Sequence, residues 1–267
     1  MYVVKKLVSS VAGLLGKGSI VMRRKNTVVL AASAVVLGLV SGEALAGNAA
    51  NLEFPYTNDG SWTLGLDHSD DSFLQVALPF TFNFYGTDYT SAYINNNGNV
   101  SFGAPYAVFT STGFPIANFP MVAPFWADVD TRNPNSGIVH YKFVDGNGDS
   151  SNDTFVVTWD NVGYFEAHTD KTNTFQVAIS TGFNTTMGVG NNICFSYDDM
   201  MWTTGDQSSG NNGFGGTPAT VGVNKGDGVT FAQIGRFDRA GTGYDGPNGT
   251  NDGVDWLDFQ TICFSVG

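Results

Sequence analysis

The sequence has few of the residues that metal, thiol or nucleic-acid chemistry requires. Its 267 residues include only two cysteines, three histidines and 12 lysines or arginines, against 24 aspartates and glutamates. His68, His140 and His168 lie in separate segments without the HExxH spacing of a zinc enzyme, and no GxSxG hydrolase motif is present. Because a net charge of −12 repels phosphate groups, we expect no nucleic-acid partner.

Apolar segments long enough to span a bilayer are also lacking. The apolar stretch 28–40 has about 13 residues, short of the roughly 20 that a membrane-spanning helix needs. It follows a basic cluster and precedes Ala44-Leu45-Ala46, which places small residues at the two positions that signal peptidase reads. We therefore expect residues 1–46 to be a signal peptide with an N-terminal extension, cleaved after Ala46; a membrane anchor is the alternative. Residues 1–21 could derive from an upstream start codon, because Met22 begins a well-proportioned signal by itself.

Cleavage would leave an acidic and exported protein. It would remove six of the 12 basic residues and one of the 24 acidic ones, so the net charge would change from −12 to −17. The remaining acids are nearly all aspartates beside glycine or asparagine, which is typical of turns. We expect residues 47–267 to form a single domain that is secreted, extracellular or at the cell surface, without membrane insertion after cleavage.

No segment after residue 47 shows a convincing helical period, whereas strand patterns are frequent. In LPFTFNFYG, residues 78–86, Phe80, Phe82 and Phe84 alternate with polar residues. YINNNGNVSFG, residues 93–103, has the turn of a hairpin, and APFWADVD, residues 123–130, is a near-continuous apolar strand that ends on two carboxylates. Further short strands are expected at 138–143, 154–159, 175–179, 193–197, 219–223, 229–234 and 259–266.

This spacing predicts an all-β fold, an antiparallel β-sandwich with long loops rich in Gly, Asn and Asp. The segment 51–72 should be irregular, with Trp62 and Leu64 packed on the core. Two long polar connections, residues 203–217 and 236–255, are either plain surface connections or functional loops.

The strand motifs resemble the NIDO domain, an extracellular module named after nidogen and also found in tectorin-like and many bacterial secreted proteins. Further matching segments follow in order: VTWDNVGYF, HTDKTNTFQVAI, CFSYDDMMWTTGD, GFGGTPATVGVN and IGRFD. The resemblance extends from about Asn58 to Phe264, nearly all of the mature chain, and points to a bacterial secreted member. It implies a non-catalytic module for cell–matrix adhesion, with a matrix or cell-surface protein or polysaccharide as partner.

The alternative function is a carbohydrate-binding or carbohydrate-acting β-sandwich, in which aromatic rings stack on sugars. Exposed aromatic side chains in or beside the long connections are candidate ligand contacts: Phe214, Tyr244 and Trp256. Asp128 and Asp130 are the only plausible carboxylate pair for glycoside hydrolysis. Acidic residues at the end of a strand are common without a catalytic role, so we expect that the protein is not an enzyme.

Aspartate-rich turns raise the question of structural calcium, the only cofactor considered. Asp145, Asn147 and Asp149 place oxygens at every second position, as in an EF-hand loop, but the bidentate Glu is missing and an ordinary turn is the alternative. Asp128 and Asp130 share one face of a strand, and their repulsion could be relieved by a cation or by Arg132. A third oxygen-rich cluster comprises Asp245, Asn248, Asn251, Asp252 and Asp255.

The two cysteines, Cys194 and Cys263, each lie in an Ile-Cys-Phe-Ser sequence. In an exported protein an even number of cysteines favours a disulfide, with two buried thiols as the alternative. The bridge would join the last strand to the strand at 193–197, and closing a loop of about 70 residues would contribute roughly 4 kcal/mol.

Overall fold

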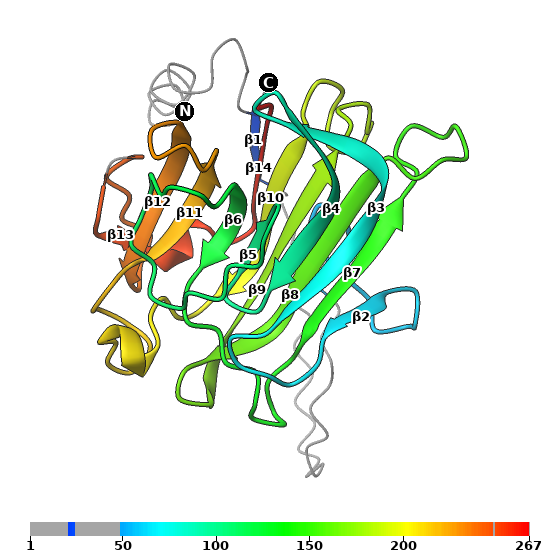
Figure 1. Cartoon of the computed structure of the whole chain (residues 1–267). Helices are drawn as coiled ribbons and strands as arrows, with labels where there is room; N and C mark the ends of the chain where they lie inside the picture. Colours follow the sequence, from blue (N-terminus) through cyan, green and yellow to red (C-terminus); the bar gives the residue numbers. More distant parts are fainter. Residues whose placement is uncertain (1–20, 25–48, 248, 267) are drawn as a thin grey trace.

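The computed structural model describes residues 21–24, 49–247 and 249–266, which form two packed seven-stranded sheets (Figure 1). The first sheet has the order β1 (Val21–Arg24), β14 (Gln260–Phe264), β10 (Ile193–Met200), β9 (His168–Ser180), β8 (Thr154–Tyr164), β7 (Val139–Val144) and β2 (Thr63–Leu66). The second has the order β13 (Asp252–Gly253), β12 (Phe231–Arg239), β11 (Ala219–Asn224), β6 (Met121–Trp126), β5 (Asn99–Ser101), β4 (Thr87–Asn95) and β3 (Phe73–Phe84).

All strand pairs are antiparallel except β12–β13, which is parallel. The described helices are two short 3-10 turns, η1 (Asp206–Ser208) and η2 (Val254–Trp256). Within the described ranges, no helix has the length and apolarity needed to cross a membrane. The predicted all-β sandwich is confirmed. The predicted signal peptide lies outside the described residues, apart from the four that form β1.

The predicted central strands form the core as their patterns require. In β3, Phe82 and Phe84 are buried and the residues between and before them are exposed, so the period of two is confirmed. The asparagine turn closes the β4–β5 hairpin with Asn95 opposite Asn99. Gly98 in this turn has φ of 72°, and a Cβ there would lie 1.8 Å from the Phe125 carbonyl oxygen. Only glycine fits this close approach between the turn and β6.

Both sheets are also covered on their outer faces, which explains why β6 and β14 are buried on both sides, as is most of β8. On the first sheet, side chains of the segment 49–62 pack on Val156, Ala178 and the two cysteines: Ala49, Leu52, Phe54, Tyr56 and Trp62. The Gln176 side chain fixes this segment, because its Oε1 accepts the Phe54 N–H at 3.0 Å and its Nε2 donates to the Phe54 carbonyl at 2.9 Å.

On the second sheet, Tyr106, Phe114 and Ile116 cover the outer face of β6. The segment 51–72 is less irregular than predicted, since it contains β2. Trp62 is buried as expected, but Leu64, in β2 at the edge of the first sheet, is 50% exposed.

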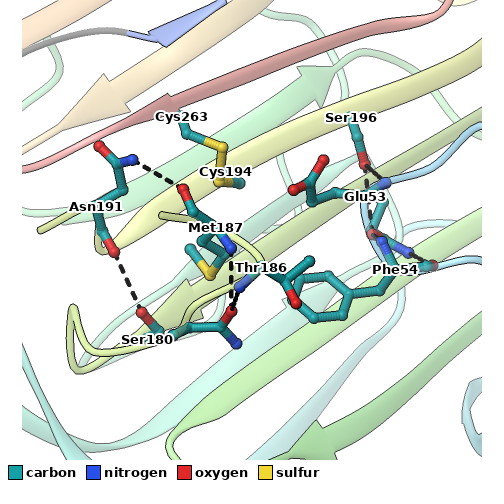
Figure 2. Close-up of a disulfide and its surroundings, with 11 residues drawn as sticks. Glu53, Phe54, Ser180, Thr186, Met187, Asn191, Cys194, Ser196 and Cys263 are labelled. Atoms are coloured by element: carbon teal, nitrogen blue, oxygen red, sulfur yellow. Dashed lines mark hydrogen bonds between the residues drawn. A yellow bond between two sulfur atoms is a disulfide. The ribbon is translucent and has the colours of Figure 1, made fainter. Parts of the chain in front are cut away.

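Cys194 and Cys263 form the predicted disulfide, which joins directly opposite residues of β10 and β14. Figure 2 shows the bridge beside Met187, in the apolar cluster that the 49–62 segment covers. The bridge therefore fixes the last strand of the chain to the middle of the first sheet.

Candidate functional site

At one end of the sandwich, five segments that are distant in the sequence come together. Asp130, just after β6, pairs with Asp70, and Val129 pairs with Tyr164 of β8. The Ala127 N–H donates to the carbonyl of Asn97 in the hairpin turn. The Asp206 N–H donates to the Phe165 carbonyl, at 2.8 Å, and so attaches the 203–217 connection to the same place.

Asp130 is fully enclosed by hydrogen-bond donors. Its Oδ1 accepts the Arg132 backbone N–H at 3.0 Å and Arg132 Nε at 2.9 Å, and its Oδ2 accepts the Ala167 N–H at 2.9 Å. Burial acts to raise the pKa of Asp130, but the hydrogen bonds from Arg132 and Ala167 outweigh it and hold the pKa below its usual value. Arg132 also forms an ion pair with Asp70, at 3.1 Å. Arg132 thus relieves the expected repulsion at Asp130.

Asp128 has the opposite environment. It is 2% exposed, and its Oδ2 has no hydrogen-bond partner in the part of the chain that the structure describes. The carboxyl lies against Gly205, where a Cβ would be only 2.7 Å from Oδ2. Burial, and then the charges of Asp70, Asp71 and Asp130, raise the pKa of Asp128 to about 7.

A polar depression of about 810 Å³ lies next to these carboxylates. Its lining comes from three segments, and the residues are Asn133, Tyr164, Ala167, His168, Thr169, Asp170, Asp206, Gly210, Asn211 and Asn212. Neither Asp128 nor Asp130 belongs to this lining, so the pair is not placed as two catalytic carboxyls of a glycosidase would be.

Side-chain contacts keep the lining of the depression in place. His168 Nε2 lies 2.9 Å from Asp206 Oδ2, which links β9 to the 203–217 connection. The Tyr164 hydroxyl donates to Asp170 Oδ1 at 2.9 Å, and its ring stacks on His168 with the centroids 4.7 Å apart. Lys171 Nζ donates to Asp170 Oδ2 at 2.6 Å and to Asn212 Oδ1 at 3.0 Å. The result is an open surface of amide, carboxylate and hydroxyl groups.

The three aromatic residues predicted as ligand contacts do not line the depression, and all three are less exposed than expected. Phe214 is half-buried against the core, and Lys171 Nζ lies over its ring, 5.9 Å from the ring centroid. Tyr244 and Trp256 stack on one another with centroids 3.9 Å apart, and both pack on the core. The Tyr244 hydroxyl donates to the Ile234 carbonyl, and burial raises its pKa. The expected exposure is therefore corrected, because each ring packs against apolar neighbours; a role as ligand contacts stays a prediction.

Several of the other predicted calcium ligands accept hydrogen bonds from backbone N–H groups. Asp145 accepts the N–H groups of Gly148 at 2.7 Å and Ser150 at 2.8 Å, and Asn147 Oδ1 accepts that of Asp149 at 2.9 Å. Asp252, buried beside β12, accepts two backbone N–H groups, and Asn248 lies outside the described residues. Among the described residues, no group of three or more His, Cys, Asp or Glu is arranged to hold a metal ion. Calcium binding stays a prediction.

Reasoning from sequence missed Asp70, Asp71, Asn133 and Asp206 as members of one site. A signal for it was present, since the segments VGYF, HTDK and WTTGD, all quoted above for the family resemblance, contribute Tyr164, His168 and Asp206 to this lining.

The fold and the site define a β-sandwich module with an open polar depression at one end. The chain belongs to the nidogen-like domain family, whose model matches residues 90–243, from β4 to the loop after β12. It is 31% identical to mouse alpha-tectorin over 205 residues, which cover 68% of this chain and 9% of the tectorin. It is 28% identical to Drosophila melanogaster nidogen over 162 residues, or 53% of this chain and 12% of the nidogen. The chain thus spans only about a tenth of these curated relatives. No solved structure matches it significantly.

Proposed function

We propose that this chain is an extracellular, matrix-associated interaction module that binds a matrix or cell-surface protein or polysaccharide without catalysis. The observation that carries the proposal is that three of its nidogen-like motif segments contribute residues to the lining of the polar depression. A surface lined by exposed amide and carboxylate groups from several loops suits recognition. Membership of the nidogen-like domain family supports an extracellular, matrix-associated module. Binding of a partner at the polar depression is our inference.

Carbohydrate binding is the second candidate, and the lining favours it in one respect. Asn133, Asn211 and Asn212 present amide groups suited to sugar hydroxyls. The one lining aromatic ring, that of Tyr164, is 1% exposed and so offers no stacking face. We therefore rank a protein or an extended polymer above a single sugar ring.

The test is an array of matrix proteins and polysaccharides, probed with the exported protein in calcium and again in EDTA. We expect saturable binding without released product, and we expect Asn211→Arg to weaken it at least tenfold by placing a long cation in the depression. Thr81→Arg, on the exposed face of β3, is the matched control and should bind as the wild type does.

Other outcomes would change the conclusion. Binding confined to glycans would select the carbohydrate candidate, and released sugar would contradict the non-catalytic function. Equal binding by the Asn211→Arg and Thr81→Arg variants would show that the depression is not the contact surface. Loss of binding in EDTA would support the predicted structural calcium.

A further inference from the structure

The outer edge of β14 is occupied by a strand from the predicted leader. β1 pairs with β14 in antiparallel register, with Val21 opposite Cys263 and Arg24 opposite Gln260. In Figure 1, β1 (blue) lies beside β14 (dark red) at the edge of the first sheet. Cleavage after Ala46 would remove β1 and leave β14 as the edge strand.

The backbone groups of β14 that face this edge can be identified from its pairing with β10. Cys194 and Cys263 are opposite one another with their Cα atoms 4.1 Å apart. This short distance is typical of a non-hydrogen-bonded antiparallel pair. The N–H and C=O groups of Cys263, and by alternation those of Thr261, therefore point away from β10 and toward β1.

Nothing in β14 protects this edge once β1 is absent. Natural edge strands are commonly blocked by lysine, by proline or by a bulge. The sequence of β14, Gln-Thr-Ile-Cys-Phe, contains neither residue, and its pairing with β10 runs without a register shift. The disulfide holds the strand against β10, so an incoming strand would meet an edge that is already ordered.

The charges near β14 indicate what kind of strand fits. Asp258 precedes β14, and Asp198, Asp199 and Asp255 are close enough that, after burial, their charges raise its pKa to about 7. In the register of β1, the residues opposite Thr261 and Gln260 at this acidic end are Arg23 and Arg24. A second copy of the mature chain is disfavoured by the charge of −17 that it would bring.

We propose that the exposed β14 edge of the exported chain is a strand-addition site for an extended segment of a partner protein. The segment adds antiparallel to β14, with apolar residues opposite Ile262 and Cys263 and basic residues opposite Gln260 and Thr261. The inference depends on removal of the leader and is independent of the polar depression.

The test titrates the exported protein, with its N-terminus verified by mass spectrometry, against a labelled peptide of residues 19–26, followed by fluorescence anisotropy. Saturable binding is expected. N-methylation of the Arg23 amide, which in this register points at β14, should weaken binding at least tenfold. N-methylation of the Met22 amide, which points away, is the matched control and should change affinity less than twofold.

Two further comparisons test the occupant and the location. Peptide with Arg23→Glu and Arg24→Glu should bind at least tenfold more weakly, and the uncleaved chain 1–267 should also bind at least tenfold more weakly because β1 fills the edge. The Asn211→Arg variant should bind the peptide normally, which separates this site from the depression. Absence of peptide binding, equal effects of the two N-methyl groups, or equal binding by cleaved and uncleaved chains would overturn the proposal.

Discussion

Asp128 and Asp130 lie two residues apart after the same strand, yet the fold gives them opposite electrostatic environments. Asp130 accepts hydrogen bonds from Arg132 and Ala167 and is held ionised. Asp128 is buried against Gly205 without a partner for Oδ2, and the pKa of its carboxyl is raised to about 7. The first carboxylate stabilises the folded state at neutral pH, and the second opposes it.

We predict that asparagine substitutions at these two positions change stability in opposite directions at pH 8. A pKa unit corresponds to about 1.4 kcal/mol, so ionised Asp128 destabilises the folded state by up to about 4 kcal/mol. The asparagine of the variant removes this cost but leaves a buried amide unpaired, which costs about 1–3 kcal/mol. Asp128→Asn should therefore raise the free energy of unfolding by up to about 1–3 kcal/mol. Asp130→Asn should lower it by about 2–3 kcal/mol, since it leaves the Arg132 charge without its main partner.

Urea unfolding at pH 8 and pH 5 measures both effects, and the gain from Asp128→Asn should shrink at pH 5. If Asp128→Asn were destabilising at pH 8 in calcium but not in EDTA, a bound cation would partner Asp128, as the predicted calcium site requires. Destabilisation of the same size in EDTA would contradict the environment described here.

At the scale of the elements, the β10–β14 pair contains the disulfide and lies next to β1 at the edge of the first sheet. The bridge closes a separation of 69 residues and belongs to the apolar cluster under the 49–62 segment. Its contribution is therefore twofold, because it restricts the unfolded chain and also fills the outer face of the sheet.

We predict that Cys194→Ala with Cys263→Ala lowers the free energy of unfolding by about 4 kcal/mol, chiefly through the closed loop. Equilibrium denaturation of the oxidised wild type and the double variant measures the difference. Reduction of the wild type by dithiothreitol is the control, since it breaks the bridge without removing the side chains. A loss below about 1 kcal/mol in both would show that the unfolded chain is not restricted as the loop-closure model assumes.

At the scale of the whole molecule, several carboxyls share the behaviour of Asp128. Burial is the first cause in each case, raising the pKa of Asp70 to about 6 and those of Asp160, Asp252 and Asp258 to about 7. A carboxyl whose pKa is higher in the folded than in the unfolded chain weakens the fold as pH rises from about 4 to its folded pKa. The expected charge of −17 after cleavage acts in the same direction.

We predict that the melting temperature is several degrees higher at pH 5 than at pH 8. Below about pH 4 stability should fall again, because carboxyls with lowered pKa values, such as Asp130, become protonated. Thermal unfolding from pH 3 to pH 9 at constant ionic strength measures this profile. A melting temperature that rises steadily from pH 5 to pH 8 would contradict the prediction.

Local patterns in the sequence were enough for much of the fold. The alternation of Phe80, Phe82 and Phe84 predicted β3, the asparagine turn predicted the β4–β5 hairpin, and two cysteines in a chain expected to be exported predicted the bridge. The strand and the turn depend on residues that are neighbours in the chain, and the two cysteines can form a disulfide only with one another. These features can therefore be predicted from the sequence alone.

Tertiary structure alone decided which residues form the site. Whether Asp128 or Asp130 meets Arg132, Ala167 or Gly205 depends on how β6, the β8–β9 hairpin and the 203–217 connection are placed relative to one another. The half-buried positions of Phe214, Tyr244 and Trp256, and the strand beside β14, depend on the same packing. The period of two in a strand shows which of its faces is buried. It does not show which distant segment packs on that face, because this depends on the tertiary arrangement.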